Sequence, residues 1–123
     1  MNKKNFGYSG ETVACTYLKN KNYKILERNF YYHGGELDII AYDRDHNTLV
    51  FVEVKTRANL KFGYGVEAVG YVKLNNIIKG AKYYLYIKGI NNVNIRFDVI
   101  DLYYINRKFL INHIKQIIWY CKP

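Results

Sequence analysis

Proline and long apolar runs are nearly absent from this chain of 123 residues. Its one proline is Pro123, and no Gly/Ser-rich stretch or repeat divides the sequence, so we expect a single domain over residues 1–123. The first residues, Met1 to Phe6, lack the apolar segment of a signal peptide, and no run approaches the roughly 18 apolar residues of a membrane span. We therefore expect a soluble, cytoplasmic protein.

Cysteine and histidine are also scarce. Cys15 and Cys121 lie near opposite ends of the chain, without the spacing of a zinc site or the density of a secreted disulfide scaffold. Both are expected to be reduced, with Cys15 acting as a small apolar residue. His33, His46 and His113 are too scattered to suggest a zinc site, and we expect turn or surface positions for all three.

Acidic residues are few: the chain has 10 Asp and Glu against 19 Lys and Arg, for a net charge of +9. Residues 1–60 hold nine basic and seven acidic residues, and residues 61–123 hold ten basic and three acidic residues. This asymmetry suits an enzyme that binds a polyanion and cuts it at a cation site, although an ordinary solvated basic face is the alternative. The 14 tyrosines could stack on unpaired bases, or could reflect a compositional bias of the genome.

The periodicity of apolar residues predicts an α/β chain of order α-β-β-β-α-β. The expected elements are a helix over Gly7–Asn20 with Ser9 as candidate N-cap, strands near Lys24–Tyr32, Glu36–Tyr42 and Thr48–Lys55, a loop over Thr56–Val66, a helix over Val69–Lys88 and a strand over Val93–Tyr104. Short connections between the first three strands indicate an antiparallel meander. The last segment, Lys108–Tyr120, fits either a short helix or a strand followed by a tail.

Charged side chains interrupt these strands at two places. Glu53 and Lys55 end the apolar run Leu49–Val52, and side chains two residues apart share one face of a strand. Glu36 and Asp38 repeat this pattern on the preceding strand, and the meander would bring Asp38 next to Glu53. Burying charges is costly unless they meet a partner, a metal or a charged ligand. The pattern favours a metal-dependent phosphoryl-transfer site over a structural ion pair, which is the alternative.

Charged residues on the first predicted helix and on the last predicted strand also have defined faces. Glu11 lies three residues before Ala14 on the first helix, so its side chain can point toward the same interior as the acids of the strands. Arg96 and Asp98 share a face of the last predicted strand.

Several motifs together identify a family resemblance. They are Gly7-x-x-Gly10-Glu11-x-x-Ala14-x-x-Tyr17-Leu18, Ile25-Leu26-Glu27-Arg28-Asn29, Gly35-Glu36-Leu37-Asp38-Ile39-Ile40-Ala41, Phe51-Val52-Glu53-Val54-Lys55-Thr56-Arg57, Lys73 and Arg96-Phe97-Asp98-Val99. From about residue 7 to residue 101 the chain resembles the YraN-type family of bacterial proteins. That family is similar to the PD-(D/E)XK nucleases, and nearest to the archaeal Holliday-junction resolvases.

The resemblance implies a restriction-endonuclease-like core, with a mixed sheet flanked by helices. It implies that Asp38, Glu53 and Lys55 are catalytic, and that Glu11 is the glutamate that resolvase-like members add from the first helix. Asp38, Glu53 and Glu11 would then hold Mg²⁺ or Mn²⁺, which prefer oxygen ligands. Leu37 departs from the proline of the superfamily name. Glu36 is either a nearby supporting acid or part of a structural salt bridge.

These expectations lead to three functional hypotheses. The first is a Mg²⁺-dependent endonuclease that cuts DNA, with branched or flapped DNA as the candidate form, RNA as an alternative substrate and a homodimer as the candidate assembly. Candidate nucleic-acid contacts are Arg57, Lys73, Lys79 and Lys82. The second hypothesis is a non-catalytic nucleic-acid-binding or scaffold protein of the same fold. The third is a protein-interaction module with a tyrosine-rich surface.

Overall fold

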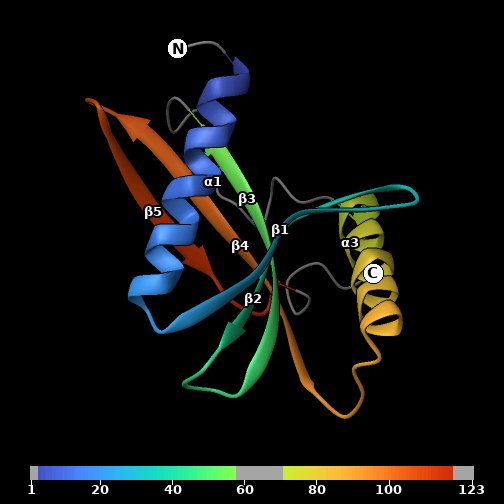
Figure 1. Cartoon of the computed structure of the whole chain (residues 1–123). Helices are drawn as coiled ribbons and strands as arrows, with labels where there is room; N and C mark the ends of the chain where they lie inside the picture. The colour runs from blue at the N-terminus through green and yellow to red at the C-terminus, as the bar shows by residue number, and fades with distance from the viewer. Residues whose placement is uncertain (1–2, 58–70, 118–123) are drawn as a thin grey trace.

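The computed structural model describes residues 3–57 and 71–117 (Figure 1). In chain order the elements are α1 (Lys3–Asn20), β1 (Tyr23–Tyr32), β2 (Gly35–Asp43), β3 (Thr48–Arg57), α3 (Tyr71–Lys88), β4 (Asn94–Ile105) and β5 (Lys108–Ile114). The α/β class and the predicted order of elements are confirmed, and one further strand, β5, follows them.

The described strands form one mixed sheet in the order β1-β2-β3-β4-β5. β1, β2 and β3 pair as the predicted antiparallel meander. β3 and β4 are parallel, and such neighbours need a crossover connection, to which α3 belongs. β5 returns antiparallel to β4 and ends the described sheet.

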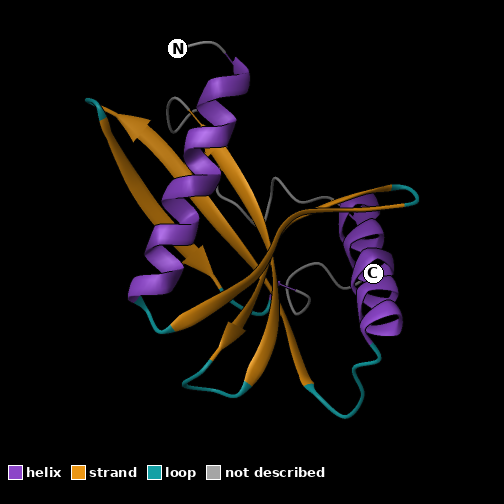
Figure 2. Ribbon diagram, viewed as in Figure 1, coloured by secondary structure: helices purple, strands orange, loops and turns teal. Residues whose placement is uncertain are grey.

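The two described helices cover opposite faces of the sheet (Figure 2). On the α1 face, the buried residues include Ala14, Leu18, Ile39, Val50, Val52 and Ile100. On the α3 face, they include Leu74, Ile77, Tyr84, Ile40, Phe51 and Val99. Because both faces of β3 are covered, its residues Leu49–Val52 are all buried and all apolar, rather than alternating with polar residues.

Several expectations about the ends of elements were wrong or are now decided. α1 begins at Lys3, so Ser9 lies inside the helix and is not its N-cap. β3 continues through Thr56 and Arg57, because both pair with β4, and they are therefore strand rather than loop residues. Residues 58–66 of that predicted loop lie outside the described part. The ambiguous last segment forms β5 as far as Ile114.

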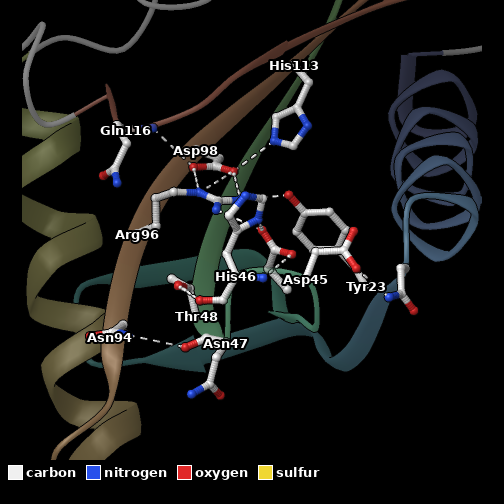
Figure 3. Close-up of polar contacts among 12 residues, drawn as sticks. Tyr23, Asp45, His46, Asn47, Thr48, Asn94, Arg96, Asp98, His113 and Gln116 are labelled. Atoms are coloured by element: carbon white, nitrogen blue, oxygen red, sulfur yellow. Dashed lines mark hydrogen bonds and ion pairs between the residues drawn. The ribbon is translucent and has the colours of Figure 1, made fainter.

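A buried polar network joins β2, β4 and β5 (Figure 3). The Nε of Arg96 donates to Asp98 Oδ1 at 2.9 Å, and its NH1 donates to Asp43 Oδ2 at 2.9 Å. Nε2 of His113 lies 2.8 Å from Asp98 Oδ2, and the His113 side chain is only 6% exposed. Arg96 and Asp98 share a face, as expected, but the expected surface or turn position of His113 was wrong. The His113 ring is buried where it contacts the carboxylate of Asp98.

The remaining expectations concern cysteine, histidine and membrane segments. Cys15 is a buried free thiol on the α1 face, as expected, and Cys121 lies outside the described residues. His33 and His46 are exposed and lie in turns, which confirms the expectation for them. Among the described helices, none is both long enough and apolar enough to cross a membrane.

Candidate functional site

Asp38 and Glu53 lie side by side where β2 and β3 stop pairing. The regular pairing runs from Asp43↔Thr48 to Ile39↔Val52 and ends there, one residue before Asp38 and Glu53 would face each other. Beyond that point, the Val54 N–H donates to Asp38 Oδ2 at 2.8 Å instead of to a main-chain carbonyl. The carboxylate of Asp38 thus replaces the missing ladder bond, and this fixes its position between the two strands.

Two more acids lie close to Asp38, one from α1 and one from its own strand, β2. Each of Glu11 on α1, Glu36 on β2 and Asp38 offers a carboxylate oxygen, and these oxygens lie within 4.8 Å of one another. Glu53 is buried, with 4% of its side chain exposed, and its charge acts on both Asp38 and Glu11. We refer to Glu11, Glu36, Asp38 and Glu53 as the carboxylate cluster. The tightest group within it contains Glu36, which the sequence alone left undecided.

Burial and mutual repulsion alter the protonation of the carboxylate cluster. Burial, followed by the charge of Glu53, raises the pKa of Asp38 from 3.8 to about 8, and the bond from Val54 only partly opposes this. Burial and the charge of Glu36 raise the pKa of Glu11. Near neutral pH the cluster therefore retains a proton that a divalent cation would displace. Its ligand atoms are all oxygens, the type that Mg²⁺ and Mn²⁺ prefer.

Lys55 lies beside the carboxylate cluster, on the strand that carries Glu53. Its Nζ is 3.8 Å from Glu53 Oε1, and 30% of the Lys55 side chain is exposed. The shared strand face predicted for these two residues is consistent with this distance. An ammonium group that is partly open to solvent can contact a phosphate as well as its neighbouring acid.

The residues predicted to contact nucleic acid differ in their exposure to solvent. Arg57 donates from Nε to Asp101 Oδ1 at 3.0 Å, and its side chain is only 11% exposed, so it holds a buried acid. Lys79 and Lys82 are exposed on α3, the helix that covers the face opposite α1. Lys73 belongs to α3, but its side chain lies outside the described part of the chain.

Sequence reasoning missed Asn29 on β1. The pairs Arg28↔Ile39 and Phe30↔Leu37 place Asn29 opposite Asp38. One end of the Asn29 amide faces two carboxylate oxygens, which can only accept hydrogen bonds. The amide nitrogen is therefore assigned to that end. Nδ2 then donates to Glu11 Oε2 at 3.0 Å and to Glu36 Oε1 at 2.7 Å. The sequence signal was the position of Asn29 within a recognised motif, which identified no partner.

Comparison with known proteins identifies the family of this chain. The model of the uncharacterised protein family UPF0102 matches residues 10–102. A UPF0102 protein of Clostridioides difficile (strain 630) is 48% identical over 114 residues, which cover 93% of this chain and 96% of the relative. The chain belongs to the UPF0102 family. The predicted membership of the YraN-type family is thereby confirmed.

Other UPF0102 relatives are similar over nearly the same extent. One from Alkaliphilus oremlandii (strain OhILAs) is 47% identical over 118 residues, which cover 94% of this chain and 98% of the relative. One from Caldicellulosiruptor saccharolyticus is 47% identical over 103 residues, which cover 84% and 86%. The UPF0102 match, residues 10–102, includes the whole carboxylate cluster and Lys55, and ends within β4.

Proposed function

We propose that this UPF0102 protein is a metal-dependent endonuclease that hydrolyses DNA phosphodiester bonds. The observation that carries the proposal is the carboxylate cluster, in which oxygens of Glu11, Glu36 and Asp38 lie within 4.8 Å of one another. Binding a polyanion alone would not need clustered acids, because they repel phosphates. Acids that jointly hold a cation instead create an attractive site for a phosphate. The resemblance to PD-(D/E)XK nucleases supports the same assignment.

The residues of the site have distinct proposed roles. Mg²⁺ or Mn²⁺ bound there would supply a water of lowered pKa and would offset negative charge on the phosphate. Asp38, Glu53 and Glu11 are the proposed ligands, and Glu36 is near enough to join them. Lys55 is proposed to orient the attacking water and to stabilise the charge that develops on the phosphate, since its Nζ lies 3.8 Å from Glu53.

The proposed partner follows from charge. A net charge of +9 favours a polyanion, and clustered acids at the reaction site fit a phosphodiester that is cut there. DNA is the proposed substrate, with branched or flapped DNA as the candidate form, and RNA is tested beside it. A homodimer, which would present two sites to two strands, is part of the proposal, as is a cytoplasmic location.

The test is a cleavage assay on single-stranded, duplex, flap and four-way DNA, and on RNA, with Mg²⁺, Mn²⁺ or EDTA. We expect cleavage that requires metal and is absent from Asp38→Ala protein purified in parallel. Lys55→Ala should cut about 10²–10³-fold more slowly while binding DNA with nearly unchanged affinity, because its interaction forms mainly in the transition state. A Lys55→Ala protein that cuts at the wild-type rate would overturn the catalytic assignment.

The same assay separates the alternative functions. Salt-sensitive binding to DNA without cleavage in any metal would make this a non-catalytic nucleic-acid-binding or scaffold protein. Absence of binding even at low salt would favour a protein-interaction module.

A further inference from the structure

Asn29 has an unusual backbone for its position. The described residues other than glycine that have positive φ are Asn22, Asn29, Asn47, Asn92, Asn106, Arg107 and Gln116. All of them except Asn29 lie in turns or connections, whereas Asn29, with φ of 52°, lies inside strand β1. The left-handed region is unfavourable for most residues, and asparagine tolerates it better than others. Such a conformation inside a strand indicates a local function that compensates for its cost.

The side chain of Asn29 supplies that function. With its amide nitrogen assigned to the side of the acids, that nitrogen lies 3.0 Å from Glu11 Oε2 and 2.7 Å from Glu36 Oε1, so one NH₂ group bridges acids from α1 and β2. Within regular β geometry its side chain would alternate with those of Arg28 and Phe30. The pair Tyr31↔Glu36 places Glu36 diagonally across from Asn29, within reach of its amide.

We propose that Asn29 is a positioning residue of the metal site, holding one oxygen of Glu11 and one of Glu36 so that the remaining carboxylate oxygens face a shared cation. The inference rests on the proposed function. Glu11 and Glu36 repel each other, and without a bridging donor their side chains would separate. The amide supplies two hydrogens and no charge, so it brings the acids together without replacing the cation. Hydrogen-bond partners of metal ligands commonly have this role.

The bridge explains how acids from separate elements remain close before metal binds. Glu11 belongs to a helix that packs on the sheet, whereas Glu36 belongs to β2 and faces Tyr31 in the register. No covalent or main-chain link fixes their separation. A single amide that contacts both restricts both rotamers at once, and this lowers the entropy that metal binding must remove.

The test is calorimetric titration of the full chain with Mn²⁺, together with the thermal shift that Mn²⁺ causes. Asn29→Gly removes the amide while keeping a residue that accepts positive φ. Asn22→Gly is the matched control, because Asn22 also has positive φ (69°) and donates to a carboxylate, that of Asp45. We expect the Kd for Mn²⁺ to rise about 10-fold or more in Asn29→Gly and to remain unchanged in Asn22→Gly.

Two more variants make the result specific. Asn29→Ser, whose one hydroxyl can bridge a single acid, should show a smaller rise in Kd and serves if the glycine variant does not fold. In a Glu36→Gln background, Asn29→Gly should raise the Kd by less than it does in the wild type, because one of the bridged acids is already missing. A purely structural role predicts equal effects in the two backgrounds.

The outcomes distinguish this inference from the proposed function. An unchanged Kd in the folded Asn29 variants, while the wild type binds Mn²⁺ and Asp38→Ala does not, overturns the role of Asn29 and leaves the metal site standing. Equal weakening in Asn29→Gly and Asn22→Gly also overturns it. If the wild type shows neither heat nor a thermal shift with Mn²⁺, the metal site fails, and the inference fails with it.

Discussion

Asp38 carries a conflict between stability and function. Its carboxylate is buried beside Glu53, and the pKa of about 8 means that ionising it in the folded protein is unfavourable at neutral pH. Two hydrogen bonds nevertheless fix its position, one from the Val54 N–H and one shared with the Glu53 side chain. An acidic group at a position where its charge would destabilise the fold is expected of a residue that serves binding or chemistry.

Asp38→Asn should therefore stabilise the metal-free protein. The amide can still accept from Val54 and donate toward Glu53, but it carries no charge to bury. Between pH 4 and 8 the folded wild type binds more protons than the unfolded chain, so its free energy of unfolding falls as pH rises. We expect a gain of about 1–2 kcal/mol for Asp38→Asn at pH 8.5 and little gain at pH 4.

Urea unfolding in EDTA at the two pH values measures this gain. Adding Mn²⁺ should reverse the order, because the cation stabilises wild type but not the variant. An equal effect of Asp38→Asn at pH 4 and pH 8.5 would contradict the assignment of a strained, ionisable Asp38.

At the scale of elements, the correct predictions were those that depend on residues close together in the sequence. Alternation and short polar connections predicted the meander of β1, β2 and β3, and with it the closeness of Asp38 and Glu53. The start of α1 was missed because its first turn has no acidic residue to mark it. β5 was ambiguous because Leu110 and Ile111 are exposed on this strand, so no clear alternation marks it.

Contacts between distant elements could not be predicted in the same way. The amide of Asn29 on β1 contacts Glu11 on α1 and Glu36 on β2. His113 contacts Asp98 across the β4–β5 pair. Neither contact follows from spacing along the chain, since each depends on tertiary packing.

The network around Arg96 should be the main polar determinant of stability among these elements. Burial alone would raise the pKa of Asp98, but hydrogen bonds from His113 and Arg96 lower it overall. Burial also opposes ionisation of Asp43, yet bonds from Arg96 and His46 lower its pKa to about 2. Stability from both acids is present above their ordinary pKa of 3.8 and is lost as pH falls through the lowered pKa of each, which for Asp43 is about 2.

Asp98→Asn should destabilise the protein by about 3–5 kcal/mol at pH 7, because it leaves the buried guanidinium of Arg96 with one fewer charged partner. The cost should shrink at pH 3, where the wild type begins to lose the same interaction. Urea unfolding at both pH values is the measurement. Asp45→Asn, at an exposed carboxylate that accepts from Asn22, is the control and should change stability little. A cost for Asp98→Asn that does not vary with pH would show that its charge is not what stabilises the network.

For the whole molecule, the distribution of charge separates the surface that would attract DNA from the site that would cut it. The net charge is +9, yet the acids of the carboxylate cluster concentrate at the end of the β2–β3 pairing. Lys79 and Lys82 lie on α3, across the sheet from α1, so any DNA contact they make is separate from contacts to α1.

The salt dependence of DNA binding tests whether α3 takes part. With Ca²⁺ in place of Mg²⁺ to prevent cleavage, Lys79→Ala and Lys82→Ala should each make the slope of log K against log[salt] shallower by about 0.9, since each removes one phosphate contact. Lys88→Ala on the same helix is the matched control. Its Nζ lies 3.5 Å from Glu27 Oε1, so much of its charge is already balanced and its removal should change the slope less. If all three variants show the same slope as the wild type, α3 does not face DNA, and the basic residues of α1 and β1 become the surface to test.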